Sequence, residues 1–211
     1  MNKLRTSLAT AGVAGVFAIL APTTASAAPN SLYSSQPGCI SVNGSTYTRG
    51  NAACESTPGG NVAIARGDGA TATANDGVGN RAFATGAGSS AYAGAGTGNV
   101  AVATNGSSAG AYAGDYNRAV ANDNSEANAS FGTRNTALSS DGSLAVASGG
   151  RQNYATARDG STAFAEVGNH NTAIATNGST ATAAYGHNNT ATASSTCTVS
   201  VIYVDNTTQR C

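Results

Sequence analysis

From residue 61 onward, small apolar and polar residues alternate in a pattern that repeats every 18 or 19 residues. The repeat is marked by asparagines at Asn61, Asn80, Asn99, Asn117, Asn135, Asn153, Asn171 and Asn189. Counted from this asparagine, the unit reads N-x-A-x-A-x-[ND]-G-S-x-A-x-A-x-x-G-x-x. Each A-x-A stretch alternates with period two, which is typical of a β-strand.

Turn-forming residues separate the two A-x-A stretches of each unit. Asn105-Gly106 and Asp141-Gly142 are examples of the first turn, and a glycine three places before the next asparagine marks the second. Such residues adopt positive φ readily. One unit therefore predicts strand, turn, strand, turn. The sequence predicts an all-β fold, a two-sheet β-solenoid (β-roll) of about eight 18-19-residue coils, with successive coils about 4.8 Å apart.

The alanine columns predict which side of each strand faces inward. Alanine recurs at the same four positions of the unit, whereas the residues between vary from Thr to Phe. Tight space explains a fixed small residue, so we expect alanine inside, between sheets closer than the usual ~10 Å. The reverse orientation remains open, as does disorder, because large apolar residues are few.

With alanine inside, the residue between the first alanine pair faces outward and is mostly apolar. This apolar column predicts an interface, either with further copies of the chain or with a cell-surface or extracellular partner. On the second sheet the matching column is mixed, including Thr73, Tyr92, Val146, Phe164 and Thr182. That mixture leaves glycan binding or ice binding as the alternative function. The apolar column consists of Ile64, Phe83, Val102, Val120, Leu138 and Ile174, with Thr156 and Thr192 at the two polar places.

Residues 1–27 have the pattern of a signal peptide. Lys3 and Arg5 precede an apolar run over residues 8–22, and Ala25-Ser26-Ala27 fits a cleavage site. No second hydrophobic segment follows, so no integral membrane segment is expected after cleavage. The sequence predicts a protein that is secreted and either extracellular or held in the cell envelope.

The four cysteines form two pairs in sequence, Cys39 with Cys54 and Cys197 with Cys211. Export favours disulfides. A rod would hold its ends apart, and cysteines bridge only at Cα separations below about 7 Å, so each pair is expected to bridge within itself. Residues 28–60 are predicted to form an N-terminal cap with a hairpin around Asn43-Gly44, residues 61–193 the solenoid, and residues 194–211 a C-terminal cap.

Nothing in the sequence predicts catalysis, a cofactor or a metal site. His170 and His187 stand in turn regions, away from any carboxylate or thiolate cluster. Asp123, Asp141 and Asp159 share one turn column. Turn propensity explains that column, although weak Ca²⁺ binding there stays open. The arginines are scattered singly along the chain, which argues against nucleic acid as a partner.

Segments such as 60–65 (GNVAIA) and 98–103 (GNVAVA) resemble head repeats of trimeric autotransporter adhesins. The unit here is longer, often has alanine where that family has glycine, and is bounded by cysteines. The whole layout also resembles small exported Ala/Gly-rich proteins of unknown function from mycobacteria and related actinobacteria. The first resemblance implies a β-roll whose inner sheets pack between chains. With the apolar column, it predicts a structural or adhesive surface module without catalytic activity.

Overall fold

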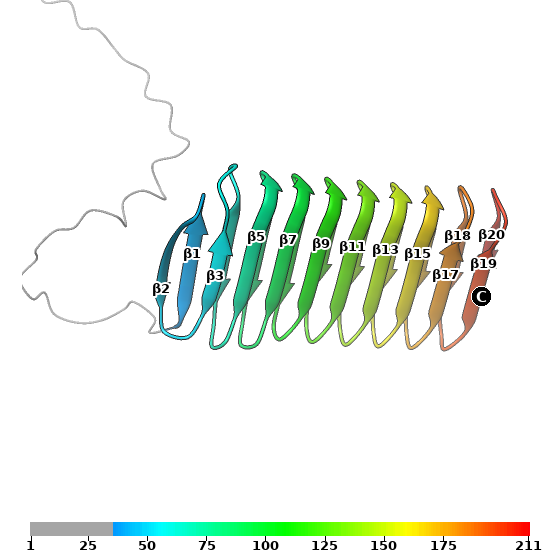
Figure 1. The fold of residues 1–211 in the computed structure, drawn as a ribbon. Helices are drawn as coiled ribbons and strands as arrows, with labels where there is room; N and C mark the ends of the chain where they lie inside the picture. Colours follow the sequence, from blue (N-terminus) through cyan, green and yellow to red (C-terminus); the bar gives the residue numbers. More distant parts are fainter. Residues whose placement is uncertain (1–35) are drawn as a thin grey trace, which may run out of the picture. The chain divides into compact units, whose positions relative to one another are not determined.

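The computed structural model describes residues 36–211, and in this range every regular element is a strand. The predicted signal peptide lies outside the described residues, as does the start of the predicted N-terminal cap. The strands form two sheets that face each other along a rod (Figure 1). The prediction of an all-β, two-sheet solenoid is confirmed.

The larger sheet, called sheet A, has 11 strands and the smaller, sheet B, has 9. In chain order, sheet A contains β1 (Gly38–Val42), β2 (Ser45–Arg49), β4 (Val62–Arg66), β6 (Arg81–Thr85), β8 (Val100–Thr104), β10 (Arg118–Ala121), β12 (Thr136–Ser139), β14 (Tyr154–Ala157), β16 (Thr172–Ala175), β18 (Thr190–Ala193) and β20 (Thr208–Arg210). Sheet B contains β3 (Ala53–Ser56), β5 (Thr71–Val78), β7 (Ser90–Thr97), β9 (Ser108–Asp115), β11 (Glu126–Thr133), β13 (Leu144–Arg151), β15 (Thr162–Asn169), β17 (Thr180–Ala184) and β19 (Thr198–Ile202).

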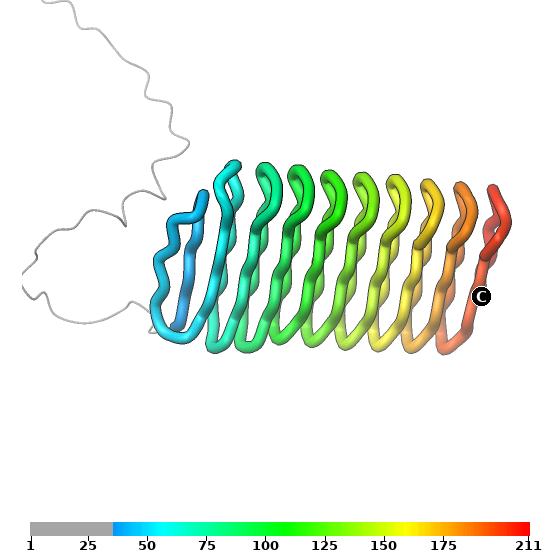
Figure 2. The backbone as a smooth tube through the Cα atoms, in the orientation of Figure 1, coloured from blue at the N-terminus to red at the C-terminus, as the bar shows by residue number. Residues whose placement is uncertain are grey.

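The chain alternates between the sheets, so each coil adds one strand to each (Figure 2). Equivalent positions stand side by side: Ala119 of β10 pairs with Ala101 on one side and Ala137 on the other. The 9 strands of sheet B correspond to nine coils, against the eight predicted. Eight of these strands follow a marker asparagine, and the ninth, β3, precedes Asn61 and pairs in parallel with β5.

The interior consists almost entirely of alanine methyl groups. The alanines of both A-x-A stretches are at most 2% exposed, which confirms the predicted orientation. Each methyl group contributes little by itself, since a methylene-sized group is worth about 0.8 kcal/mol. The coils are therefore held together largely by stacked backbone hydrogen bonds and by close contact repeated along the rod.

The turns have the positive φ angles that the sequence predicts. Asp141 (φ 58°) and Gly142 (φ 68°) illustrate the turn from sheet A to sheet B. The sequence did not reveal a second left-handed position, which lies inside the strands of sheet B. There a residue such as Phe131 (φ 51°) precedes the repeat glycine, Gly132. A Cβ at Gly132 would lie 1.8 Å from the carbonyl oxygen of Gly150 in the next coil, so only glycine fits.

The two ends of the rod are built differently. At the N-terminal end, β1 and β2 form the predicted hairpin around Asn43-Gly44, and β1 also pairs antiparallel with β4. At the C-terminal end, β19 pairs with β17 and β20 with β18 in parallel. The segment predicted as a C-terminal cap thus forms the last coil.

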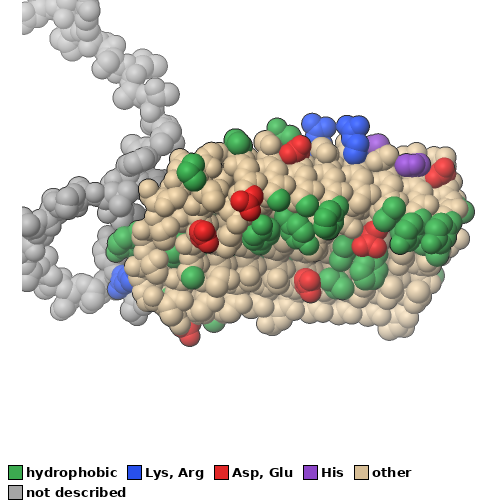
Figure 3. Space-filling view, viewed as in Figure 1, with side chains coloured by type: hydrophobic (Ala, Val, Ile, Leu, Met, Phe, Trp, Pro, Cys, Tyr) green, Lys and Arg blue, Asp and Glu red, His purple; other side chains and the backbone are tan. Residues whose placement is uncertain are grey.

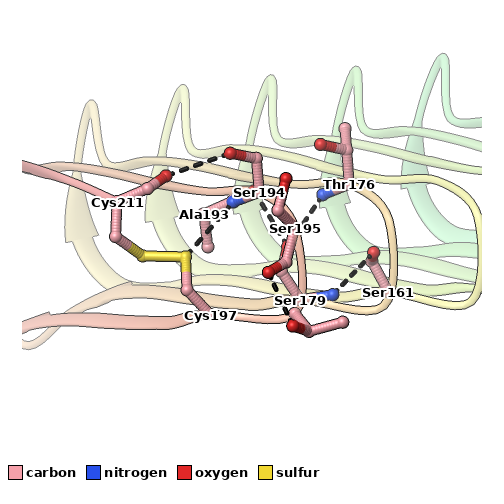
Figure 4. Close-up of a disulfide and its surroundings, with 9 residues drawn as sticks. Ser161, Thr176, Ser179, Ala193, Ser194, Ser195, Cys197 and Cys211 are labelled. Atoms are coloured by element: carbon pink, nitrogen blue, oxygen red, sulfur yellow. Dashed lines mark hydrogen bonds between the residues drawn. A yellow bond between two sulfur atoms is a disulfide. The ribbon is translucent and has the colours of Figure 1, made fainter.

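Both predicted disulfides are present and lie between the two sheets. The Cα atoms of Cys39 and Cys54 are 5.6 Å apart, and those of Cys197 and Cys211 are 6.4 Å apart. Cys39 stands beside Ala65 of sheet A, and Cys54 beside Ala72 of sheet B. This bridge therefore spans the interior where inner coils have only alanine. Figure 4 shows the second bridge, one coil beyond Ser179.

Candidate functional surfaces

Inside the rod, the repeat asparagines form a continuous hydrogen-bonded ladder. All eight are at most 1% exposed. The backbone N–H of Asn135 donates to Oδ1 of Asn117 (3.0 Å), and Oδ1 of Asn135 accepts from the N–H of Asn153 (3.0 Å). Its Nδ2 donates to the carbonyl oxygens of Ser130 (3.1 Å) and Gly150 (3.3 Å). This asparagine ladder satisfies backbone groups that the strand ends would otherwise leave unpaired.

The turn serines form a second buried ladder. The N–H of Ser143 donates to Oγ of Ser125, and the N–H of Ser161 donates to Oγ of Ser143, each at 3.1 Å. Ser179 continues this series and donates from Oγ to the carbonyl of Ala193 at 2.8 Å (Figure 4). Both ladders are internal, so these polar side chains support the fold and are not presented to a ligand.

The apolar column lies in register on the outer face of sheet A. Val120 pairs with Val102 and with Leu138. Phe83 pairs with Ile64, and β1 extends the column by Ile40. The six predicted apolar residues are all partly exposed, while the small residues on either side of them, alanines or Ser139, are buried. The structure therefore brings the residues from Ile64 to Leu138 together as one stripe, and the buried Thr156 separates Ile174 from it.

Arginine is the only charged residue type in the strands of sheet A. Arg81 and Arg118 are exposed at outward positions beside the apolar column. Arg49 and Arg66 both pair with Gly38 and so lie in one row near the N-terminal end. The described strands of this sheet contain neither Asp nor Glu. Residues far apart in the sequence therefore create a face that is both apolar and positively charged.

The outer face of sheet B carries the opposite charge. Glu55, Glu126 and Glu166 occupy outward strand positions, and Asp76 lies at a left-handed position of β5. Among the described strands of this sheet, Arg151 at the end of β13 is the one basic residue. Acidic and apolar side chains share the visible face in Figure 3.

Apolar and aromatic side chains also gather on sheet B. Val146 pairs with Phe164 near the middle of the face. Tyr112 contacts Tyr92 and Phe131 edge to face, with ring centroids 5.8 Å apart in each pair. Burial, the Asp76 carboxylate and Tyr112 raise the pKa of Tyr92 above the usual value. The mixed column predicted from the sequence contains Tyr92 but neither Tyr112 nor Phe131, and the three rings form a cluster only because neighbouring coils stack.

Near the C-terminal end, Tyr185 and Tyr203 stack with ring centroids 4.9 Å apart. They remain 50% and 74% exposed. Both have positive φ, a backbone conformation that is costly for an aromatic residue. A shallow hollow beside them is lined by His187 and Asp205, among others. The sequence does not reveal this pair, because the position varies from Asp to Tyr between units.

The candidate metal-binding residues lie at exposed turns. His170 and His187 are exposed, as predicted, and His187 Nδ1 accepts a hydrogen bond from the N–H of Asn169 at 3.2 Å. Asp123, Asp141 and Asp159 occupy the first left-handed position of successive turns. In residues 36–211 no three His, Cys, Asp or Glu side chains gather in a way that could hold a metal ion.

Within the described part of the chain, no helix is long and apolar enough to cross a membrane. Comparison of the chain with protein families, curated proteins and solved structures finds no match.

Proposed function

We propose that the protein is a secreted structural or adhesive module that associates with further copies of itself through the outer face of sheet A. The observation that carries this proposal is the apolar column, which is continuous from Ile64 to Leu138 and partly exposed. Its two disulfides are compatible with an extracellular location. Since the buried asparagines and serines form internal ladders, and His170 and His187 stand singly at turns, a scaffolding or adhesive role fits better than catalysis.

The regular spacing of the column favours a protein surface as its partner. Parallel pairing places one side chain per coil on a flat line, and a second flat sheet can pack against such a line. Val102 and Val120 lie at its centre. Two partly exposed valines that become fully buried contribute about 1 to 2 kcal/mol, enough to change an association constant about tenfold.

Replacing Val102 and Val120 by threonine tests this proposal. Threonine keeps the β-branched shape and already stands in the column at Thr156 and Thr192, so the coils should fold as before. We expect the double variant to associate about tenfold more weakly in sedimentation velocity. Val78→Thr is the matched control, because Val78 is exposed at the end of β5 in sheet B, away from the apolar column. Thr97 stands beside it in register, so threonine is tolerated there. A wild-type chain that stays monomeric at high micromolar concentration would contradict the proposal.

Glycan binding is a second candidate, supported by the exposed Tyr185–Tyr203 pair. Aromatic rings with one apolar face and a polar tip suit contact with sugar rings, and His187 and Asp205 supply polar groups beside them. A glycan array comparing the wild type with Tyr203→Ala tests it. Loss of a specific signal in the variant would support glycan binding, and the absence of any signal in the wild type would contradict it.

A further inference from the structure

We propose that the two outer faces are complementary, so that sheet A of one copy packs on sheet B of a second copy. The proposal rests on the self-association proposed above and specifies its geometry. Its occupant is a second copy of this chain, and the product is an open stack of rods lying side by side.

Charge is the first argument. Arg81 and Arg118 are exposed on sheet A, whereas Glu126 and Glu166 occupy outward positions on sheet B. Packing sheet A on a second sheet A would bring arginines against arginines, which disfavours that contact. Packing sheet A on sheet B brings arginines toward carboxylates. The segregation of charge therefore selects the contact between unlike faces.

Shape and apolar surface are the second argument. Sheet A presents Val102 and Val120 in the middle coils, and sheet B presents Val146 and Phe164 in its own middle coils. All four are partly exposed in the single chain. Since each face is a parallel sheet with one outward side chain per coil in each column, two faces can pack at the usual sheet-to-sheet distance of about 10 Å.

The contact is heterologous, and this has a consequence for assembly. A copy that uses its sheet A still has a free sheet B, and its partner still has a free sheet A. Such a contact does not close on itself unless a rotation completes a ring. The proposal therefore implies assemblies that grow with protein concentration and do not stop at a dimer.

Two charge-reversal variants test the geometry. The first is R81E/R118E on sheet A, and the second is E126R/E166R on sheet B. In other coils the equivalent positions hold residues such as Val100, Leu144 and Ser148, so the strands tolerate different side chains there. Each variant alone should associate at least about tenfold more weakly than the wild type in sedimentation velocity. An equimolar mixture of the two should recover association. The acidic sheet A of the first variant can then pack on the basic sheet B of the second, and the basic sheet A of the second on the acidic sheet B of the first.

The control is D141R/D159R, which changes the net charge as much as E126R/E166R does. Both aspartates are exposed at the turn between the sheets, outside either face. Their left-handed conformation accepts arginine, since Arg134 already has φ 59°. This control should associate like the wild type, and circular dichroism should show the same strand content in all variants.

The outcomes separate this inference from the proposed function. If the wild type and E126R/E166R associate equally, the stack of unlike faces is wrong, although self-association through sheet A stands. If the wild type is monomeric throughout, both proposals fall. A monomer that binds vesicles of anionic lipid through Arg81 and Arg118 would also overturn the stack and would assign sheet A to lipid.

Discussion

At the corner where each of the strands β4 to β18 of sheet A begins, a buried asparagine hydrogen-bonds within its own coil and to neighbouring coils. Asn135 uses its N–H, Oδ1 and Nδ2 in this way. Aspartate offers an acceptor but no donor, and two carbonyl oxygens would then face a buried carboxylate. This explains why the ladder position is always asparagine, while the exposed turn alternates between Asn and Asp.

Asn135→Asp should therefore lower the free energy of unfolding by about 3 kcal/mol or more, because it buries an uncompensated charge. Asn177→Asp is the matched control. It makes the same change at an exposed turn position where Asp141 and Asp159 stand in other coils, and it should cost less than about 0.5 kcal/mol. Thermal unfolding followed by circular dichroism compares the two. Equal unfolding midpoints for the two variants would show that the ladder position contributes no more to stability than the exposed turn position does.

Strands β5 to β15 of sheet B each contain a left-handed residue followed by glycine, and the regular pairing is interrupted at the left-handed residue. Between β11 and β13 the pairing skips Phe131 and resumes at Gly132. The skipped residue points outward with positive φ, and the glycine lies against the backbone of the next coil. At this position neighbouring coils approach too closely for any side chain to fit between them.

Gly132→Ala should be strongly destabilising, by about 3 kcal/mol or more, because its Cβ would overlap the carbonyl of Gly150. Gly142→Ala also replaces a glycine of positive φ, but no atom lies within 4 Å of the added Cβ. We expect a cost of about 1 kcal/mol there. Urea unfolding measures both, and similar midpoints would argue against a steric role for the glycine column.

The disulfide between Cys39 and Cys54 closes a loop of about 15 residues, worth about 3 kcal/mol in the chain-entropy model. Replacing both cysteines by alanine should preserve the fold, because Ala65 and Ala72 stand beside them in register. Since each coil contacts only its neighbours, amide hydrogen exchange should increase in β1 and β3 and stay unchanged in β11. The Cys197/Cys211 double alanine variant should instead affect β19. Faster exchange throughout the rod would contradict this local picture.

Residues 36–211 form a flat rod with two unlike faces, one apolar and basic, the other apolar and acidic. If unlike faces associate, added salt should weaken the assembly, because exposed charges are screened within about 10 Å at 0.1 M. A purely apolar contact would be unaffected by salt or strengthened. Light scattering across a salt series measures this. Unchanged association would show that the charges do not take part.

The sequence alone determined the architecture, because the repeat is visible in it. Period-two alternation predicts the strands, invariant alanine predicts a thin interior, and a rod with cysteines near both ends leaves one pairing of the disulfides. These features are local, or follow directly from counting residues. The nine coils agree with the prediction of about eight, and the one that was not counted contains β3, which precedes the first marker asparagine.

Only the tertiary structure decided what each column does. Whether a polar residue such as Asn135 is buried depends on the close approach of the next coil, which residue types do not reveal. Arg81 and Arg118 are isolated in the sequence, but parallel stacking and strand parity place both on the outer face of one sheet. A parallel coil brings residues 18 positions apart into contact, so the pattern of charge and aromatic groups exists only on the folded surface.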